Sequence, residues 1–332
     1  MSAIWEMPAG KSIVGTNFNT VLESYQKQID SAIDAYFRDR IKAALDYHPF
    51  IGEIYSQLRA YIMRRGKRLM SVSTLLTYEG YTGRVDKRAL RACVAIELYR
   101  HGILVHDDIV DKDETRRGGP AMHKLFDENI ALFAGNILNA LAFELISELE
   151  PRAARSLLQD YQYVNESQIL DYDFEKRIPT LGEWAVMASK RAASVFRATM
   201  LTGAILAGAP ESELKKLEKA AFHIGTAFDI QDDIIGLYEQ TNNDVERSKK
   251  PLHICYAYQL DKDFGRVYER GNIEEIRKKV RQSGALNAAK EDSKKHAEEA
   301  VKYIKSTAMS EKAKGFYLGF INYITESLDW YE

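Results

Sequence analysis

The chain has 332 residues, of which 45% are hydrophobic, and its formal net charge is −2. A chain of this size can bury a large apolar core, which excludes a small disulfide-stapled scaffold and a disordered tail. Acidic and basic residues are nearly balanced and form no basic block, so the composition gives no reason to expect a nucleic acid as a partner.

Long helices are predicted along most of the chain. Only seven prolines occur, and several coincide with other turn residues, which marks the expected helix ends. The 70 residues between Pro49 and Pro120 contain no proline, and segment 90–110 within them is apolar on most sides at helical spacing. A second apolar helix is predicted over 220–238. Because no repeat, linker or change in composition divides the chain, we predict an all-α fold with a single domain spanning 1–332.

Cysteine usage and the absence of targeting patterns bear on the compartment. Cys93 and Cys255 lie in apolar, helix-patterned stretches without paired spacing, which indicates a reducing environment rather than a disulfide framework. No run of 18 apolar residues occurs, and the first residues lack the order of a signal peptide. We therefore expect a cytoplasmic protein without stable membrane insertion.

The strongest functional signal is a group of three carboxylates, Asp107, Asp108 and Asp111, at the end of the first apolar helix. On a helix Asp107 and Asp111 lie one turn apart on one face, so their charges repel unless a cation lies between them. A few oxygen ligands from one segment are typical of Mg²⁺, which shares its coordination shell with water and substrate phosphates. A solvated acidic helix end is the plainer interpretation, but the preceding apolar run and the Arg-Arg-Gly sequence at 116–118 favour a metal site.

A second acidic group, Asp229, Asp232 and Asp233, lies inside the apolar segment 220–238. Acidic residues in a buried helix need partners. Two such groups on separate core helices predict opposite walls of one cavity, with metal ions held between them.

With these two motifs the chain resembles the trans-isoprenyl diphosphate synthases, or polyprenyl synthetases, and within them the farnesyl and geranylgeranyl diphosphate synthases. The resemblance covers nearly the whole chain and rests on the aspartate-rich motifs at 107–111 and 232–236, the Arg-Arg-Gly at 116–118, and the Gly-Lys-Arg at 66–68. It implies a helical bundle around a deep central cavity, Mg²⁺ as cofactor, isopentenyl diphosphate and allylic diphosphates as substrates, and a homodimer.

The resemblance also implies roles for individual residues. Metal ions on Asp107, Asp111 and Asp232 would bind the allylic diphosphate, and nearby Lys and Arg side chains would stabilise the leaving pyrophosphate. After ionisation, isopentenyl diphosphate would attack the allylic cation, and apolar walls would exclude water. The expected catalytic residues are Asp107, Asp108, Asp111, Lys190, Asp232 and Lys249; the expected substrate-binding residues are Gly66, Lys67, Arg68, Arg100, Arg116, Arg117, Asp229 and Asp233; Asp244 matches a further family aspartate.

Two departures from the family pattern fall in the isopentenyl diphosphate site. Met70 stands where an arginine is expected, and Arg100 stands where a histidine is expected. Since a guanidinium has a long reach and binds phosphate through two nitrogens, we expect Arg68 and Arg100 to restore the missing charge.

Four further departures lie near the allylic site. Arg191 replaces a threonine, Asp229 a glutamine, Gly236 an aspartate and Pro251 a threonine. The allylic side is nevertheless expected to be sounder than the acceptor side. This keeps alternatives open: a terpene cyclase, a prenyltransferase for another acceptor, or a non-catalytic subunit of a heteromeric synthase. The segment 243–247 begins like a cyclase motif but has Arg247 where a hydroxyl is required, and the intact first acidic group argues against a non-catalytic subunit.

Product length is expected to depend on Tyr99, Gly102 and Ile103, which precede Asp107 on the same helix. Gly102 would leave the floor of the pocket open, and Tyr99 would close it further down, which gives a product of about 20 to 25 carbons. Ordinary core packing is an equally open interpretation of Tyr99.

Overall fold

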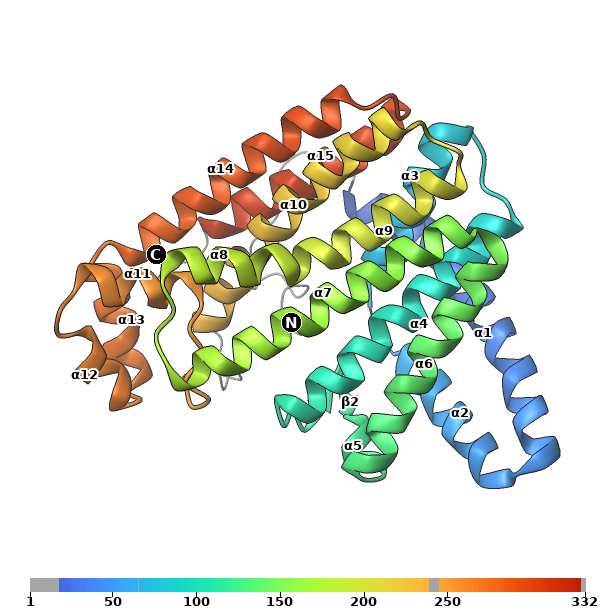
Figure 1. The fold of residues 1–332 in the computed structure, drawn as a ribbon, viewed down its shortest axis with the longest axis horizontal. Helices are drawn as coiled ribbons and strands as arrows, with labels where there is room; N and C mark the ends of the chain where they lie inside the picture. The colour runs from blue at the N-terminus through green and yellow to red at the C-terminus, as the bar shows by residue number, and fades with distance from the viewer. Residues whose placement is uncertain (1–17, 65, 239–244, 330–332) are drawn as a thin grey trace.

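The structure, a computed structural model, describes residues 18–64, 66–238 and 245–329. Within them the helices are connected by turns and loops, and the strands form one short antiparallel hairpin, in which Thr115 pairs with Pro120 and Arg116 with Gly119 (Figure 1). The predicted all-α fold is confirmed. The elements are α1 (Phe18–Tyr47), α2 (Pro49–Ile62), α3 (Leu69–Thr82), α4 (Lys87–Val110), β1 (Thr115–Arg116), β2 (Gly119–Pro120), α5 (Met122–Leu125), α6 (Glu128–Leu149), α7 (Pro151–Lys176), α8 (Leu181–Lys190), α9 (Ala192–Leu206), α10 (Glu211–Tyr238), α11 (Leu252–Leu260), α12 (Phe264–Glu269), α13 (Ile273–Gln282), α14 (Ala285–Ser306) and α15 (Glu311–Leu328).

Helix starts follow the capping chemistry of the sequence. Asp86 and Asp127 cap α4 and α6 by accepting hydrogen bonds from backbone N–H groups three residues on. Pro49 and Pro151 occupy first helical positions, where no N–H donor is needed, and Pro251 precedes α11. Pro49, Pro151 and Pro251 therefore lie at helix boundaries, as predicted, whereas Pro120 lies in β2 and Pro8 lies outside the described residues.

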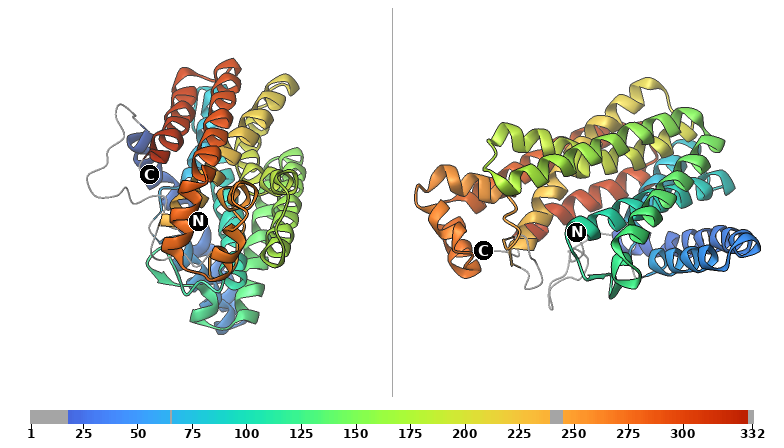
Figure 2. Two further views of the ribbon diagram at one scale, coloured as in Figure 1. Left: turned by 90° about the vertical axis from the view of Figure 1, so that its left-hand side faces the viewer. Right: turned by 60° about the horizontal axis from the view of Figure 1, so that its bottom comes forward.

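The long helices pack side by side into a bundle in which α9 is central (Figures 1 and 2). Helix α9 packs against α3, α7 and α10, while α4 packs between α3 and α6 and α10 packs against α14. One apolar core joins these helices, and a second one lies among α8, α11, α12 and α13. This arrangement brings the C-terminal ends of α4 and α10, which carry the two acidic groups, to the same side of α7 and α9.

The close approach of α9 and α10 depends on Gly225. A Cβ atom there would overlap the backbone of Ala193, in the first turn of α9. Any side chain at 225 would therefore push apart the start of α9 and the part of α10 that precedes the second acidic group.

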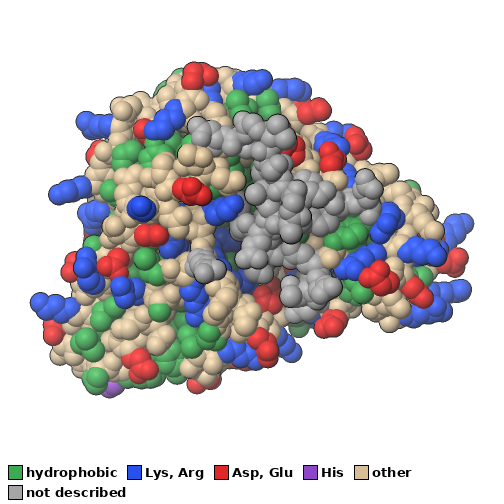
Figure 3. All heavy atoms as spheres, turned by 180° about the vertical axis from the view of Figure 1, so that it is seen from behind, with side chains coloured by type: hydrophobic (Ala, Val, Ile, Leu, Met, Phe, Trp, Pro, Cys, Tyr) green, Lys and Arg blue, Asp and Glu red, His purple; other side chains and the backbone are tan. Residues whose placement is uncertain are grey.

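Helix α6 is, within the described ranges, the one helix long and apolar enough to cross a membrane by length and composition. Half of its most apolar window is buried against the rest of the protein, as in a core helix of a soluble protein, so it is weak evidence for a membrane span. Its outer face carries Leu132 and Phe133, whose exposed fractions are 44% and 62%. On the face shown in Figure 3, charged side chains of both signs are interspersed.

Candidate active site

The first acidic group lies at the C-terminal end of α4. Asp107 is in its last turn, and Asp111 caps the helix just before Lys112, which has a positive φ of 54° and turns the chain away. The buried carboxylate of Asp107 accepts a hydrogen bond from Nε2 of Gln168 on α7, at 2.5 Å. Burial, and then the charge of Asp111, raise the pKa of Asp107 to about 6. Among the described residues no Lys or Arg forms an ion pair with Asp107, and the charges of Arg100 and Arg116 do not outweigh its burial.

Asp108 faces the protein interior instead. Its side chain is fully buried and accepts hydrogen bonds from the hydroxyl of Tyr61 at 2.8 Å and from Nε of Arg116 at 2.6 Å. Arg116 also donates to Asp113 at 2.8 Å. Asp108 and Arg116 are thus paired with each other inside the protein. Their interaction with Tyr61 and Asp113 holds the 111–120 turn against α2 and α4, so we assign them a positioning role rather than direct contact with a diphosphate.

Two cations from the segment after α10 reach the first acidic group. Arg247 forms ion pairs with Asp111 and with Glu175, the latter at 2.9 Å. Lys249 pairs with Asp171, and its Nζ lies 3.4 Å from Glu175 and 3.8 Å from Asp111. Burial alone would lower the pKa of Lys249, but the charges of Asp171 and Asp111 outweigh it and raise that pKa. Lys249 thus lies where it was predicted, among the carboxylates.

Three of these partners were missed in the sequence. Gln168, Asp171 and Glu175 lie on α7 with spacings of three and four residues, which places them on one face of the helix. That repeated polar spacing on one face of the helix is the signal that would have found them. Arg247 carried no such signal, because its role depends on where the segment 245–250 lies.

The second acidic group lies on α10. Asp229 and Asp233 each accept a hydrogen bond from Arg191, from Nε and Nη2 respectively, both at 2.8 Å. Asp232 is half-buried and interacts electrostatically with Arg100, as Asp107 does from α4. The two acidic groups therefore share one electrostatic environment around Arg100, as the sequence predicted for opposite walls of one site.

Lys190 lies apart from this arrangement. Its ammonium group pairs with Glu166 on α7 and lies over the ring of Tyr163, 4.3 Å from the ring centroid. The structure thus places Lys190 beside α7 rather than among the aspartates.

The predicted acceptor-site residues gather around α4 and the 111–120 turn. Arg117 donates from Nη1 to Nε2 of His101 at 3.0 Å, and its guanidinium covers Gly66, where a Cβ atom would lie 2.9 Å from Nη1. Burial lowers the pKa of His101 to about 3, so the imidazole is a neutral acceptor. Lys67 donates to Oδ1 of Asn19 on α1 at 2.9 Å. Gly66, Lys67 and Arg117 are therefore brought together.

Arg68 is a correction to the prediction that it supplies missing charge to the acceptor. Its side chain is 1% exposed and pairs with Asp30 at 2.7 Å and with Glu97 at 3.0 Å. Burial would raise the pKa of Glu97, but Arg68 holds it down at about 2. Both charges are thus matched inside the protein. Arg100, whose charge also interacts with that of Arg117, remains placed for the acceptor.

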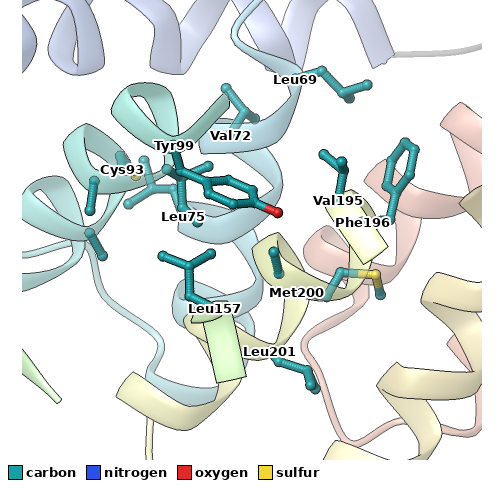
Figure 4. Packing of buried hydrophobic residues seen from close by; sticks show 14 of the residues in the cluster. Leu69, Val72, Leu75, Cys93, Tyr99, Leu157, Val195, Phe196, Met200 and Leu201 are labelled. Carbon is teal, nitrogen blue, oxygen red and sulfur yellow. The ribbon is translucent and has the colours of Figure 1, made fainter. Parts of the chain in front are cut away.

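The floor predicted to be open at Gly102 is filled. A Cβ atom at Gly102 would lie 2.5 Å from Oδ1 of Asn139 on α6, so the glycine serves the close contact of α4 with α6. Ile103 is buried. Tyr99 is fully buried among α3, α7 and α9 side chains such as Leu75 and Leu157 (Figure 4).

The acidic groups differ in how well they suit Mg²⁺. Among the described residues no three His, Cys, Asp or Glu side chains converge on one point, so a metal would need oxygens from a ligand as well, which is typical of Mg²⁺ with diphosphates. Asp107 and Asp111 fit this role, as does Asp232 across the site. Asp229 and Asp233 fit it poorly, because Arg191 already matches them. Asp244 lies outside the described residues.

Comparison with known proteins decides the family. A polyprenyl synthetase sequence profile matches residues 52–292. The chain belongs to the polyprenyl synthetase family. It is 32% identical to a geranylgeranyl pyrophosphate synthase of Geoglobus acetivorans over 268 residues, 75% of this chain and 83% of that one. It is 31% identical to a geranylfarnesyl diphosphate synthase of Aeropyrum pernix over 210 residues, 58% and 66% of the two chains.

The fold comparison agrees with this family. A solved geranylgeranyl pyrophosphate synthetase from Geoglobus acetivorans superposes with a TM-score of 0.81 at 27% identity, covering 94% of this chain and 99% of that one. The predicted family and enzyme class, a trans-prenyltransferase, are confirmed. The cyclase, other-acceptor and non-catalytic alternatives are not favoured. A single domain over 1–332 stays a prediction.

Proposed function

We propose that this polyprenyl synthetase uses Mg²⁺ to condense isopentenyl diphosphate with an allylic diphosphate, giving a trans-polyprenyl diphosphate of 20 carbons or slightly more. The observation that carries the proposal is the placement of Asp107 and Asp232, from two different core helices, around one buried arginine, Arg100. The relatives named for geranylgeranyl and geranylfarnesyl products support this product range.

Mg²⁺ held by Asp107, Asp111 and Asp232 would neutralise the diphosphate and make it a better leaving group. Arg247 and Lys249 add positive charge at the same place, and each has a second carboxylate, Glu175 or Asp171, to which it stays paired when a metal takes Asp111. The positive charge of this segment therefore remains next to the leaving group.

The acceptor would be bound from the other side. Arg117 contacts His101 and covers Gly66, the residue before Lys67, and the charge of Arg100 acts on Arg117. Lys67, Arg100 and Arg117 would supply the positive charge for the acceptor's diphosphate. The allylic C–O bond breaks and its electron pair leaves with the diphosphate. The acceptor double bond then attacks the allylic carbon, and the product forms when a proton is lost from the resulting cation. The apolar walls of α3, α4 and α9 exclude water that would quench the cation.

The test is direct incubation with Mg²⁺, isopentenyl diphosphate and the 5-, 10- or 15-carbon allylic diphosphate, followed by mass analysis of products. Longer diphosphates support the proposal. Release of pyrophosphate with a hydrocarbon or alcohol and no elongation would instead support a cyclase, and absence of turnover with every substrate would support a non-catalytic subunit.

Tyr99 is proposed to limit product length. Its hydroxyl is buried without a hydrogen-bond partner in the described structure, so the ring serves as bulk rather than as a polar anchor. Tyr99→Ala is expected to add about one isoprene unit or more to the main product, since it opens space in the core. Tyr99→Phe keeps the bulk and is the matched control. An unchanged product distribution for Tyr99→Ala would assign the residue to core packing alone.

A homodimer is proposed as well. The exposed Leu132 and Phe133 on α6 support it, because such apolar residues are typical of interfaces. Light scattering on the protein and on a Phe133→Glu variant tests this proposal: a dimer that becomes a monomer supports it, and a wild-type monomer contradicts it.

A further inference from the structure

Two histidines meet between α10 and α14, away from the residues assigned to the candidate active site. Nδ1 of His223 on α10 lies 3.0 Å from Nδ1 of His296 on α14, so one imidazole donates a hydrogen bond to the other. Both side chains are half-buried, and His223 precedes Asp229 on α10 by less than two turns. The proposed condensation uses neither histidine.

Aromatic neighbours fix the orientation of both imidazoles. The ring of Phe222 makes edge contacts with His223 and His296, at centroid distances of 5.0 Å and 5.6 Å. Tyr303 on α14 stacks on His223 at 5.7 Å, with an interplanar angle of 15°. The two nitrogens are therefore held by the packed interface of α10 and α14, as the ligands of a preorganised site are.

Both imidazoles are neutral near pH 7, which is the form that binds metal ions. Burial, and then the charge of His296, lower the pKa of His223 to about 4. Burial also lowers the pKa of His296, although the charge of Asp292 opposes that shift. A metal ion that binds both Nδ1 atoms therefore requires only that the Nδ1 proton move to Nε2, and no net loss of a proton.

The charged side chains around the pair are mixed in sign. The carboxylate of Glu299 acts on His223 and that of Asp292 on the second imidazole, and both favour a bound cation. The ammonium groups of Lys219 and Lys302 act on His223 in the opposite direction. Because the two carboxylates and the two ammonium groups offset each other, the ring nitrogens decide which ion binds.

The separation of the two nitrogens favours one coordination geometry. With metal–nitrogen bonds of about 2.0–2.1 Å, two ligands at a right angle lie about 2.8–3.0 Å apart, whereas tetrahedral ligands lie about 3.3–3.4 Å apart. The separation of 3.0 Å matches the right angle of square-planar and tetragonal sites, which are typical of Cu²⁺ and Ni²⁺. The described residues bring no third His, Cys, Asp or Glu side chain to this point, so water would complete the coordination shell.

We propose that His223 and His296 form a second metal site, which binds a transition-metal ion of the Cu²⁺ or Ni²⁺ type through the two Nδ1 atoms and joins α10 to α14. Imidazole nitrogen suits these ions, whereas Mg²⁺ prefers the carboxylate oxygens of the proposed function, so the two sites take different metals. A bound ion would stabilise the part of α10 that precedes the second acidic group. The site needs no diphosphate and does not depend on the condensation reaction.

The test is a Cu²⁺ titration followed by electron paramagnetic resonance, without substrate and with Mg²⁺ in excess to fill the carboxylate sites. The wild type is expected to bind Cu²⁺ with hyperfine splitting from two nitrogens. His223→Gln and His296→Gln are each expected to weaken Cu²⁺ binding by about tenfold or more, because losing even an outer partner of a metal ligand costs that much. His48→Asn is the matched control: it removes an exposed imidazole and keeps a capping side chain at α2, and it is expected to bind Cu²⁺ as the wild type does.

Two results would overturn the inference. One is a wild-type spectrum with fewer than two nitrogens on the Cu²⁺, which decides the question even if a variant fails to fold. The other is an affinity for Cu²⁺ in either Gln variant equal to that of the wild type. Loss of elongation activity plays no part in this test, so failure of the proposed function and failure of the histidine site are separate outcomes.

Discussion

At the end of α4 the carboxylate of Asp107 accepts a hydrogen bond from the amide of Gln168 and forms no ion pair with a described residue, whereas on α10 the carboxylates of Asp229 and Asp233 share a guanidinium. Both places are buried, yet the charges of Arg100 and Arg116 only partly offset the burial of Asp107, while Arg191 contacts both carboxylates on α10 directly. The difference teaches that an acidic motif in a sequence does not by itself define a metal site. Whether such a motif can bind a metal ion depends on whether the fold already pairs its carboxylates with a Lys or Arg side chain.

The largest expected effect is on stability at the second group. Arg191→Met leaves two poorly hydrated carboxylates without their partner, and it is expected to lower the free energy of unfolding by about 3–5 kcal/mol. Arg247→Met is the matched control, because Asp111 is 29% exposed and keeps Lys249 nearby; its expected loss is about 1 kcal/mol or less. Urea unfolding in EDTA measures both. An equal decrease in the free energy of unfolding for the two variants would mean that Arg191 and Arg247 stabilise their carboxylate partners to the same extent.

The next effect is on catalysis at the first group. Asp107→Asn removes a carboxylate that forms no ion pair with a described residue and is proposed to hold Mg²⁺, and kcat/KM is expected to fall about 100-fold or more. Asp233→Asn is expected to cost about tenfold or less, since Arg191 already matches that charge. Glu114→Gln is the surface control, with a side chain that is 81% exposed. The contrast between the groups fails if Asp233→Asn is as damaging as Asp107→Asn.

A third effect is a pH-dependent gain in stability. Since the pKa of Asp107 is about 6 in the folded protein and 3.8 in the unfolded chain, ionisation costs the folded state, and the cost grows between about pH 4 and pH 6. Without metal, Asp107→Asn is therefore expected to raise the free energy of unfolding by about 1–3 kcal/mol at pH 7 and by almost nothing at pH 4. Denaturant curves at both pH values check this; a destabilised variant at pH 7 would show that Asp107 is already matched.

The smallest effect concerns metal affinity. Arg247 competes with a metal ion for Asp111, so Arg247→Met is expected to tighten Mn²⁺ binding by about two- to fivefold, which corresponds to a surface-type ion pair. Calorimetric titration in the absence of substrate measures it. Weaker binding in the variant would indicate that Arg247 helps to form the site rather than competing for it.

The sequence predicted the helices and the two acidic motifs because both depend on local spacing. Asp107 and Asp111 were recognised from that spacing, whereas Lys249 was expected from the family resemblance, and the structure places it within 3.8 Å of Asp111. The role of Asp108 was not predictable, since its neighbours Tyr61 and Arg116 come from α2 and the β-hairpin and meet it only in the folded chain.

The same limit explains the errors at Arg68 and Gly102. Arg68 appears basic and available in the sequence, but Glu97 lies 29 positions away and matches it inside the core. The glycine at 102 suggests free space in the sequence, but in the folded protein the side chain of Asn139 on α6 fills that space. The roles of Arg68 and Gly102 depend on contacts between segments that are distant in the sequence, and local sequence patterns do not reveal such contacts.

The pairing of Arg191 with Asp229 also has a consequence for how such a site arises. A change at 191 alone would still give the new arginine a partner in Asp233, whereas a change at 229 alone would bury a carboxylate with no cation to match it. The step at 229 is therefore penalised unless the arginine is already present. Among relatives of this protein, aspartate at the position of 229 is expected to occur together with arginine at the position of 191, and aspartate there without the arginine is expected to be rare.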